Sequence, residues 1–279
     1  MPVVLISGGT GLIGTNLTRH LSEKNYDVII LTRDKDKQSD NPKISYAFWD
    51  IQNHEMDEAA IKKADHIIHL AGAGVMDRKW TKNYKDQILE SRTKSASLLV
   101  NTLQQNSHHV TSFVSASAIG WYGADAKPLK RKDGFIETDF ADDSFLGETC
   151  RLWEASVEPV EEMGIRLVKL RTGIVLSNDG GAYKEFKNPL KFGIAAILGD
   201  GRQIVSWIHI DDLCRMYIEA IENKELNGSY NSVAPMPVTY KKLILHAAET
   251  IKNKFYIPLH VPEFLLKLMM GQRSIEILK

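Results

Sequence analysis

Short, continuous apolar runs alternate along the first part of the chain with stretches in which apolar side chains recur every three or four positions. The runs predict buried strands, and the three-to-four spacing predicts amphipathic helices. The predicted strands cover residues 3–6, 28–31, 66–70, 113–115 and 167–170, and helical spacing fills the gaps after the first and third of them. Strands that alternate with helices predict an α/β fold with a doubly wound parallel sheet and helices on both faces.

The charge balance and the cysteine content narrow the classes of partner and cellular compartment. Thirty-five Lys and Arg residues balance 35 Asp and Glu residues, so no bulk field gathers nucleic acid or anionic membranes, and we expect neither as a partner. Cys150 and Cys214 have no neighbours at metal-ligand spacing, so we expect no disulfide scaffold and no metal site. The sequence shows no apolar run of membrane-spanning length and no secretory signal, so we expect a cytoplasmic protein.

A glycine-rich turn follows the first predicted strand and opens the first predicted helix. Glycines at such a turn permit a tight bend, a close approach of backbone to a pyrophosphate, and close packing of helix on strand. The N-terminus of the helix adds a partial positive charge. This context predicts dinucleotide binding, with contacts from Gly8, Thr10, Gly11, Leu12, Ile13 and Gly14.

The end of the second predicted strand bears on the choice of dinucleotide. An NAD site needs an acidic residue there, whereas a nearby Arg accommodates the 2′-phosphate of NADP. Thr32 stands in the acidic position and Arg33 follows it, so NADP(H) is favoured. Asp34 is the next residue, and its carboxylate leaves NAD as the alternative cofactor. Asp50 follows a further predicted strand and is a candidate for the adenine amino group.

Three stretches in this order resemble the extended short-chain dehydrogenase/reductase superfamily: Gly8-x-x-Gly11-x-x-Gly14, residues 69–72 (HLAG) and residues 206–213 (SWIHIDDL). More closely, the chain resembles the bacterial "epimerase family" branch of atypical members. The stretches that resemble this branch are 69–74, 78–81, 91–92, 117–123, 153–154, 171–176, 180–181 and 271–273.

The resemblance implies a Rossmann-type NADP(H)-binding domain with an interleaved C-terminal substrate lobe. We expect residues 1–176 to form the first domain, residues 177–279 mainly the lobe, and residues 204–234 to return to the first domain. The resemblance also implies that the natural chain continues beyond Lys279. Further cofactor contacts carried over by position are Leu70, Ala71, Gly72, Gln87, Arg92 and Val175.

The catalytic pattern of the superfamily is incomplete in this chain. Typical members carry Tyr-x-x-x-Lys on one helix, where Tyr is the general acid/base and Lys lowers the pKa of its phenol. Counting places Leu146 and Cys150 at these positions, and neither can do that proton chemistry. The pair Tyr183 and Lys187 has the right spacing, but it comes after residues 171–176 and is treated as coincidence.

The remaining catalytic candidates are Ser117, at a strand end, and Tyr122, in the loop that follows. Substrate candidates are Arg78, Trp80, Gly180 and Trp207. The leading hypothesis is an NADP(H)-dependent oxidoreductase or epimerase acting on a sugar-like or nucleotide-linked small molecule, as a monomer or dimer. The alternative is a catalytically inert NADP(H)-binding regulatory protein, because the Tyr and Lys are absent.

Overall fold

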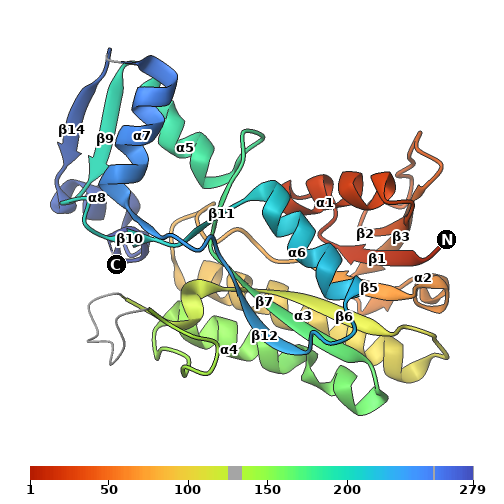
Figure 1. Cartoon of the computed structure of the whole chain (residues 1–279). Coiled ribbons are helices and arrows are strands. Elements are labelled where there is room, and N and C mark those ends of the chain that lie inside the picture. The colour runs from red at the N-terminus through yellow and green to blue at the C-terminus, as the bar shows by residue number, and fades with distance from the viewer. Residues whose placement is uncertain (125–133, 254, 279) are drawn as a thin grey trace.

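The computed structural model describes residues 1–124, 134–253 and 255–278. Within this part of the chain the main sheet has eight strands (Figure 1). Neighbouring strands pair in parallel, except at one edge, where β4 is antiparallel to β3. In spatial order they are β12 (Gly228–Ser232), β7 (Arg166–Thr172), β6 (Ser112–Ala118), β5 (His66–His69), β1 (Val3–Ser7), β2 (Asp27–Thr32), β3 (Ile44–Asp50) and β4 (Glu55–Met56).

Helices cover both faces of this sheet (Figure 1). Successive strand residues point to opposite faces, so Val4 and Ile6 pack with one group of helices, whereas Leu5 packs with the other. The first group is α1 (Leu12–Glu23) and α6 (Ile210–Glu222), and the second is α2 (Glu58–Lys63), α3 (Lys82–Gln105), α4 (Phe145–Val157) and the 3-10 helix η2 (Glu158–Met163). The predicted doubly wound fold is confirmed.

The order of the strands reverses at β1. The chain proceeds outward on one side through β2 and β3, and on the other side through β5, β6 and β7. A crevice forms at the carboxyl ends of parallel strands where the order reverses, and ligands of such sheets bind there. The fold therefore places the ligand site above the ends of β1 and β5.

A smaller part of the molecule stands on the side toward which β1 points (Figure 1). Its helices are α5 (Gly181–Leu190), α7 (Tyr240–Lys252), α8 (Glu263–Met270) and α9 (Arg273–Leu278), and its strands are β9 (Ile194–Leu198), β10 (Ile204–Val205), β13 (Val238–Thr239) and β14 (Ile257–Val261). Between the two parts β8 (Ile174–Leu176) pairs with β11 (Trp207–His209), and the 3-10 helix η1 (Ile119–Trp121) follows β6.

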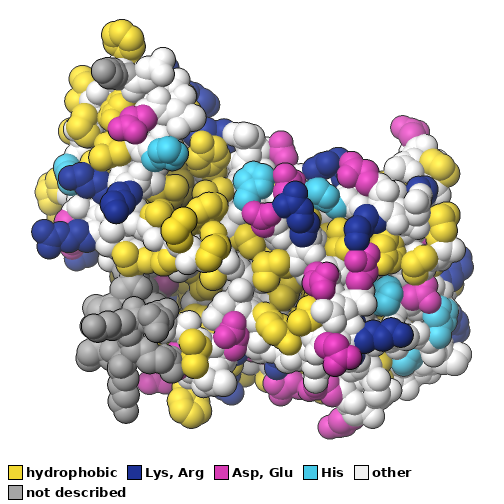
Figure 2. All heavy atoms as spheres, in the orientation of Figure 1, with side chains coloured by type: hydrophobic (Ala, Val, Ile, Leu, Met, Phe, Trp, Pro, Cys, Tyr) yellow, Lys and Arg dark blue, Asp and Glu magenta, His cyan; other side chains and the backbone are white. Residues whose placement is uncertain are grey.

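Figure 2 shows exposed apolar side chains gathered on this smaller part. Four residues of the smaller part, Phe192, Phe255, Phe264 and Leu268, are each more than 70% exposed. In the described residues no helix has the length and apolar character needed to cross a membrane.

Replacing Gly14 by Ala should destabilise the protein by about 1–3 kcal/mol, because buried backbone leaves no room for a side chain. An added Cβ would overlap Gly8 O and lie 2.5 Å from Gly9 Cα. Gly11→Ala is the matched control, since its Cβ would meet only Gly8 O at 3.4 Å. Urea unfolding checks both variants, and equal losses of unfolding free energy would contradict this account.

Candidate cofactor and substrate site

A glycine-rich turn joins β1 to α1. Gly8 has φ +72°, and an added Cβ would lie 2.9 Å from both Leu70 C and Ala71 N, so only glycine fits between the turn and the end of β5. Helix α1 begins after Gly11, which provides no side-chain cap, and its first turn contains no acidic residue. The first N–H groups of α1 therefore keep their partial positive charge for an anion.

Three buried side chains link the ends of β1 and β5 to α3. Ser7 Oγ lies 2.6 Å from His69 Nδ1, and Ser95 Oγ lies 3.3 Å from His69 Nε2. Because Ser7 Oγ accepts from the N–H groups of Leu70 and Ala71 at 3.2 and 3.4 Å, its own proton goes to Nδ1. His69 then carries its ring proton on Nε2 and donates it to Ser95, which donates to a backbone carbonyl of α3.

This chain of hydrogen bonds requires a neutral imidazole. Burial lowers the pKa of His69 to about 4, so the ring is neutral at pH 7 and Nδ1 can accept. The chain therefore fixes Leu70 and Ala71 beside the glycine turn. We predicted contacts for these two residues but assigned no role to His69 or Ser7. A polar residue at the end of a buried strand, next to a glycine turn, is the signal that could have found both.

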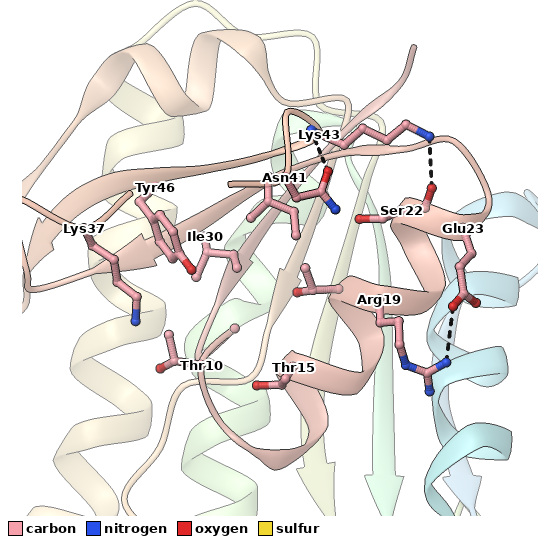
Figure 3. A pocket seen from close by; sticks show the side chains of 13 residues that line it. Thr10, Thr15, Arg19, Ser22, Glu23, Ile30, Lys37, Asn41, Lys43 and Tyr46 are labelled. Atoms are coloured by element: carbon pink, nitrogen blue, oxygen red, sulfur yellow. Dashed lines mark hydrogen bonds and ion pairs between the residues drawn. The ribbon is translucent and has the colours of Figure 1, made fainter. Parts of the chain in front are cut away.

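A cavity of about 620 Å³ opens beside the glycine turn, between α1 and the loop that joins β2 to β3. In Figure 3, Lys37 and Thr10 lie at one end of this cavity, whereas Lys43 and Asn41 lie at the other. Lys37 Nζ stands 5.1 Å from the centroid of the Tyr46 ring. The other lining residues are Gly9, Thr15, Thr18, Arg19, Ser22, Glu23, Ile30 and Ile44. The cavity therefore offers an ammonium group beside the turn, which suits an anionic group.

The residues predicted at the ends of β2 and β3 lie elsewhere. Thr32 Oγ1 accepts from Asp34 N at 3.2 Å, and Arg33 is exposed and does not line the cavity. The Asp50 carboxylate accepts from the side chain and backbone of Asn53 at 2.9 and 3.3 Å. The bonds from Asn53 and one from Gln52 N at 2.8 Å hold the pKa of Asp50 below its ordinary value, with a smaller contribution from the charge of Arg33. Sequence reasoning missed Lys37 because it lies in the loop, past the end of the strand.

Three predicted residues that are distant in sequence meet at the first turn of α1. An added Cβ at Gly180 would lie 3.7 Å from Leu12 Cδ1. At Gly181, where φ is +67°, it would lie 2.9 Å from Leu12 Cδ2 and 3.8 Å from Val175 O. The loop between β8 and α5 therefore lies against the helix that follows the glycine turn, and Ile13 packs against the apolar cluster beneath it.

A second cavity, of about 310 Å³, brings together Gln87, predicted for the cofactor, and Arg78, predicted for the substrate. Trp80 lies between them in sequence, and its Nε1 donates to Val75 O at 2.8 Å. Trp207 belongs to β11, and its Nε1 donates to Met236 O at 3.2 Å. The other lining residues of this cavity are Lys79, Thr81, Asn83 and Tyr84.

A buried ion pair holds Ser117. Glu154 on α4 and Arg171 on β7 are each 3% exposed, and Arg171 donates to both carboxylate oxygens at 2.8 and 3.0 Å. The hydroxyl of Ser117 donates to the same carboxylate at 2.6 Å. Sequence reasoning missed this pair because only the packing of α4 on the sheet brings the two charges together. A serine engaged in this way positions α4 on the end of β6.

The hydroxyl group of Tyr122 both donates and accepts a hydrogen bond within the protein. Its O–H donates to Asn231 Oδ1 at 2.6 Å, and the hydroxyl oxygen accepts from Arg171 at 3.0 Å. Burial raises the pKa of Tyr122, against the opposing effect of the bond from Arg171. A phenol of raised pKa and complete hydrogen bonding anchors the loop after β6. Its role as an acid/base stays a prediction.

Leu146 and Cys150 lie one turn apart on α4, and both face Gly120. An added Cβ at Gly120 would lie 3.2 Å from Leu146 Cβ and 3.6 Å from Cys150 Sγ. Burial raises the pKa of the Cys150 thiol to about 11, although the charge of Arg92 acts to lower it. A phenol and an ammonium at these positions would stand at the end of β6, where the superfamily pattern requires them. Tyr183 and Lys187 lie on α5, with Lys187 Nζ 4.6 Å from the Tyr183 ring centroid.

A parallel sheet that reverses beside a glycine turn, with an uncapped helix behind that turn, defines a dinucleotide-binding α/β protein. The chain belongs to the NAD dependent epimerase/dehydratase family, whose model matches residues 4–232. The predicted family resemblance is thereby confirmed, and the protein is epimerase-like.

Two relatives in bacteria and two solved structures are similar over nearly the whole chain. An epimerase family protein of Staphylococcus saprophyticus is 37% identical over 276 residues, covering 98% of this chain and 88% of that protein. The epimerase family protein YfhF of Bacillus subtilis is 32% identical over 276 residues, with coverage of 99% and 88%. The human epimerase family protein SDR39U1, solved with NADPH, gives a TM-score of 0.83 at 25% identity and covers 99% of this chain and 88% of that chain. A nucleoside-diphosphate sugar epimerase from Corynebacterium glutamicum gives a TM-score of 0.72 at 31% identity, covering 99% and 57%.

Lowering the pH from about 6.5 to about 4 should destabilise the protein through His69. The unfolded chain binds a proton at the ordinary pKa of 6.5, whereas the folded state resists protonation until about 4. The contribution of neutral His69 to the unfolding free energy is therefore fully present above about pH 6.5. It falls by about 3 kcal/mol as the pH is lowered to about 4. His69→Gln should flatten the pH dependence of the unfolding free energy by about that amount, measured in urea between pH 4 and 7. An unchanged slope in this variant would show that other groups titrate.

Tyr122→Phe should lower the unfolding free energy by about 1–3 kcal/mol, because it leaves the buried Arg171 and the partly buried Asn231 without the phenol hydroxyl. Affinity for a bound dinucleotide should stay within about twofold of the wild type, since the hydroxyl is engaged within the protein. Chemical unfolding and fluorescence titration measure the two quantities. A variant of unchanged stability that loses turnover by about 10²–10⁴-fold would instead identify Tyr122 as the acid/base.

Proposed function

We propose that the protein binds NADP(H) and is an oxidoreductase or epimerase for a sugar-like or nucleotide-linked small molecule. The observation that carries this proposal is the open N-terminus of α1 behind the glycine turn, placed where the strand order reverses. The cofactor would supply hydride transfer when bound. Gly8 and Gly11 would let the backbone approach its pyrophosphate, and Leu70 and Ala71 would line it at the end of β5.

The cavity beside α1 supports the choice of NADP(H). Adenosine of a dinucleotide lies toward β2, and a 2′-phosphate needs a cation within reach of the glycine turn. Lys37 lies at the turn end of the cavity together with Thr10 (Figure 3). Its approach to the face of Tyr46 favours a side chain held over the cavity. Human SDR39U1, with which this chain is 25% identical, was solved with NADPH.

The second cavity supports a negatively charged small molecule as substrate. Arg78 and Lys79 line it beside the polar groups of Asn83 and Gln87. A cation, an amide and a tyrosine in one concave site are a typical set for orienting a polar ligand. The similarity to a nucleoside-diphosphate sugar epimerase at 31% identity favours a nucleotide-linked sugar.

The alternative function is an NADP(H)-binding regulator without turnover. It is favoured by one observation, that Leu146 and Cys150 occupy the α4 positions facing the end of β6. Assays of NADPH oxidation and of sugar epimerisation over a panel of nucleotide sugars separate the two functions. Turnover supports the enzyme, whereas tight NADPH binding without turnover on any member of the panel supports the regulator.

Lys37→Ala should weaken NADPH binding by about 1.5–3 kcal/mol and leave NADH binding nearly unchanged, because only NADPH carries the 2′-phosphate. Arg33→Ala should reduce NADPH affinity as well, but less, since Arg33 does not line the cavity. Fluorescence titration with both nucleotides measures these affinities.

Lys43→Ala provides the control for net charge, because Lys43 lines the same cavity at its far end (Figure 3). Its NADPH affinity should match the wild type. Equal losses of NADPH and NADH affinity in Lys37→Ala would refute the assignment of the 2′-phosphate, and failure of the wild type to bind either nucleotide would refute the proposed function.

A further inference from the structure

The β5 loop, residues 70–81, is held by side chains at four successive carbonyl groups. The donors and acceptors are Arg92 to Ala73 O at 3.1 Å, Tyr84 to Gly74 O at 2.6 Å, Trp80 to Val75 O at 2.8 Å and Arg273 to Met76 O at 2.6 Å. Two of the donors belong to α3 and one belongs to the loop itself. The fourth, Arg273, is the first residue of α9, so its bond joins the loop to the smaller part of the molecule.

Arg273 is also anchored within the smaller part. Its Nε donates to Met270 O at 3.3 Å, and the next residue, Ser274, is 1% exposed and donates to a backbone carbonyl at 2.7 Å. An added Cβ at Gly199 would lie 2.8 Å from Leu278 Cδ2, so α9 lies against the turn that follows β9. Because α9 packs in this way, the guanidinium group of Arg273 must move with the smaller part.

The smaller part contacts the larger part on both sides of the crevice where the strand order reverses. On the β1 side, Asn16 of α1 donates to the carboxylate of Asp179, in the loop before α5, at 3.4 Å. On the β5 side, Arg273 Nη1 holds Met76 O. Any displacement of the smaller part across the crevice therefore acts on the backbone of the β5 loop at Met76.

The residues that follow Met76 line the second cavity. Arg78 and Lys79 are exposed cations of the β5 loop, and Tyr84 of α3 completes this wall. Burial raises the pKa of Tyr84, whereas the charges of Arg78 and Arg273 act to lower it, so both cations lie near this phenol. An exposed cation binds an anion more tightly when its backbone is already fixed, because less conformational entropy is lost on binding.

We propose that Arg273 is a positioning residue for the second cavity: by holding Met76 O, it makes the placement of Arg78 and Lys79 depend on the smaller part. The inference rests on the proposed binding of a negatively charged small molecule in that cavity. When the two parts close on such a ligand, α9 carries the β5 loop with it and sets the two cations against the anionic group. Residues 271–273, a stretch of the family resemblance to which no function was assigned, thereby gain one.

The first test measures amide hydrogen exchange in Arg273→Met, which keeps an unbranched side chain and removes the N–H groups. Exchange of peptides that cover residues 76–81 should rise about fivefold or more, because Asp77 N and Thr81 N donate within the loop at 3.4 and 2.9 Å. Peptides of α3 should exchange at the wild-type rate. Met76→Ala is the matched control and should change nothing, since the carbonyl group that accepts from Arg273 remains. Unchanged exchange of the loop in Arg273→Met, or an equal rise over the whole chain, would overturn the inference.

The second test measures binding of UDP-glucose, used as the probe for a nucleotide-linked sugar. Arg273→Met should weaken its binding about fivefold or more and change NADPH binding less than about twofold, because Ser7 holds Leu70 and Ala71 without Arg273. Arg273→Lys, which keeps a cationic donor, should bring the affinity for UDP-glucose back to within about threefold of the wild type.

Arg202→Met is the control for charge, because Arg202 is an exposed cation of the smaller part that pairs with Asp200. Its affinity for UDP-glucose should match the wild type. Wild-type affinity in Arg273→Met, or an equal loss in Arg202→Met, would overturn the inference. Failure of the wild type to bind UDP-glucose would refute the proposed class of ligand, whereas the exchange test still decides whether Arg273 holds the β5 loop.

Discussion

The hydrogen bonds of one hydroxyl group hold the site together at the point where the sheet reverses. Parallel strands whose connections run in opposite directions leave a crevice, and at its rim the backbone of β1 holds the loop after β5 by one hydrogen bond, from Leu70 N to Ser7 O at 3.0 Å. Ser7 bridges this gap by accepting from two backbone N–H groups after β5 and donating to His69. Because burial keeps that imidazole neutral, the direction of every proton in the chain is determined. The position of the glycine turn relative to the end of β5 depends on these bonds.

The main sheet was predictable because its strands are buried on both faces. Such strands read as continuous apolar runs, and the residues 3–6, 28–31 and 167–170 fall within β1, β2 and β7. The predicted helices correspond to α1 and α3, whose apolar residues recur at helical spacing. The strand order was not predictable, since apolar character does not tell which strands pair. The division of the chain into lobes stays a prediction.

In the candidate site, residues that are neighbours in sequence could be predicted, whereas residues that meet only through the packing of separate elements could not. The glycine turn was predictable because its residues are contiguous and its chemistry depends on backbone. Glu154 and Arg171 were not recognised as partners, because their contact arises only from the packing of α4 beside β7. Arg92 was placed near the cofactor by resemblance, but its relation to Cys150 depends on the adjacency of α3 and α4. Side chains that meet across elements therefore need the structure.

The pairing of β8 with β11 has a consequence for how the two parts can evolve and move. The chain leaves the main sheet after β7 and enters the smaller part through β8. It returns through β11 and α6 to β12 of the main sheet, and leaves again for β13. The smaller part is thus built from two separate segments of the chain, one before β11 and one after β12. Neither part can therefore be removed or exchanged as one continuous segment. Several backbone connections also share any change in the angle between the parts, which favours small shear displacements over free rotation about one hinge.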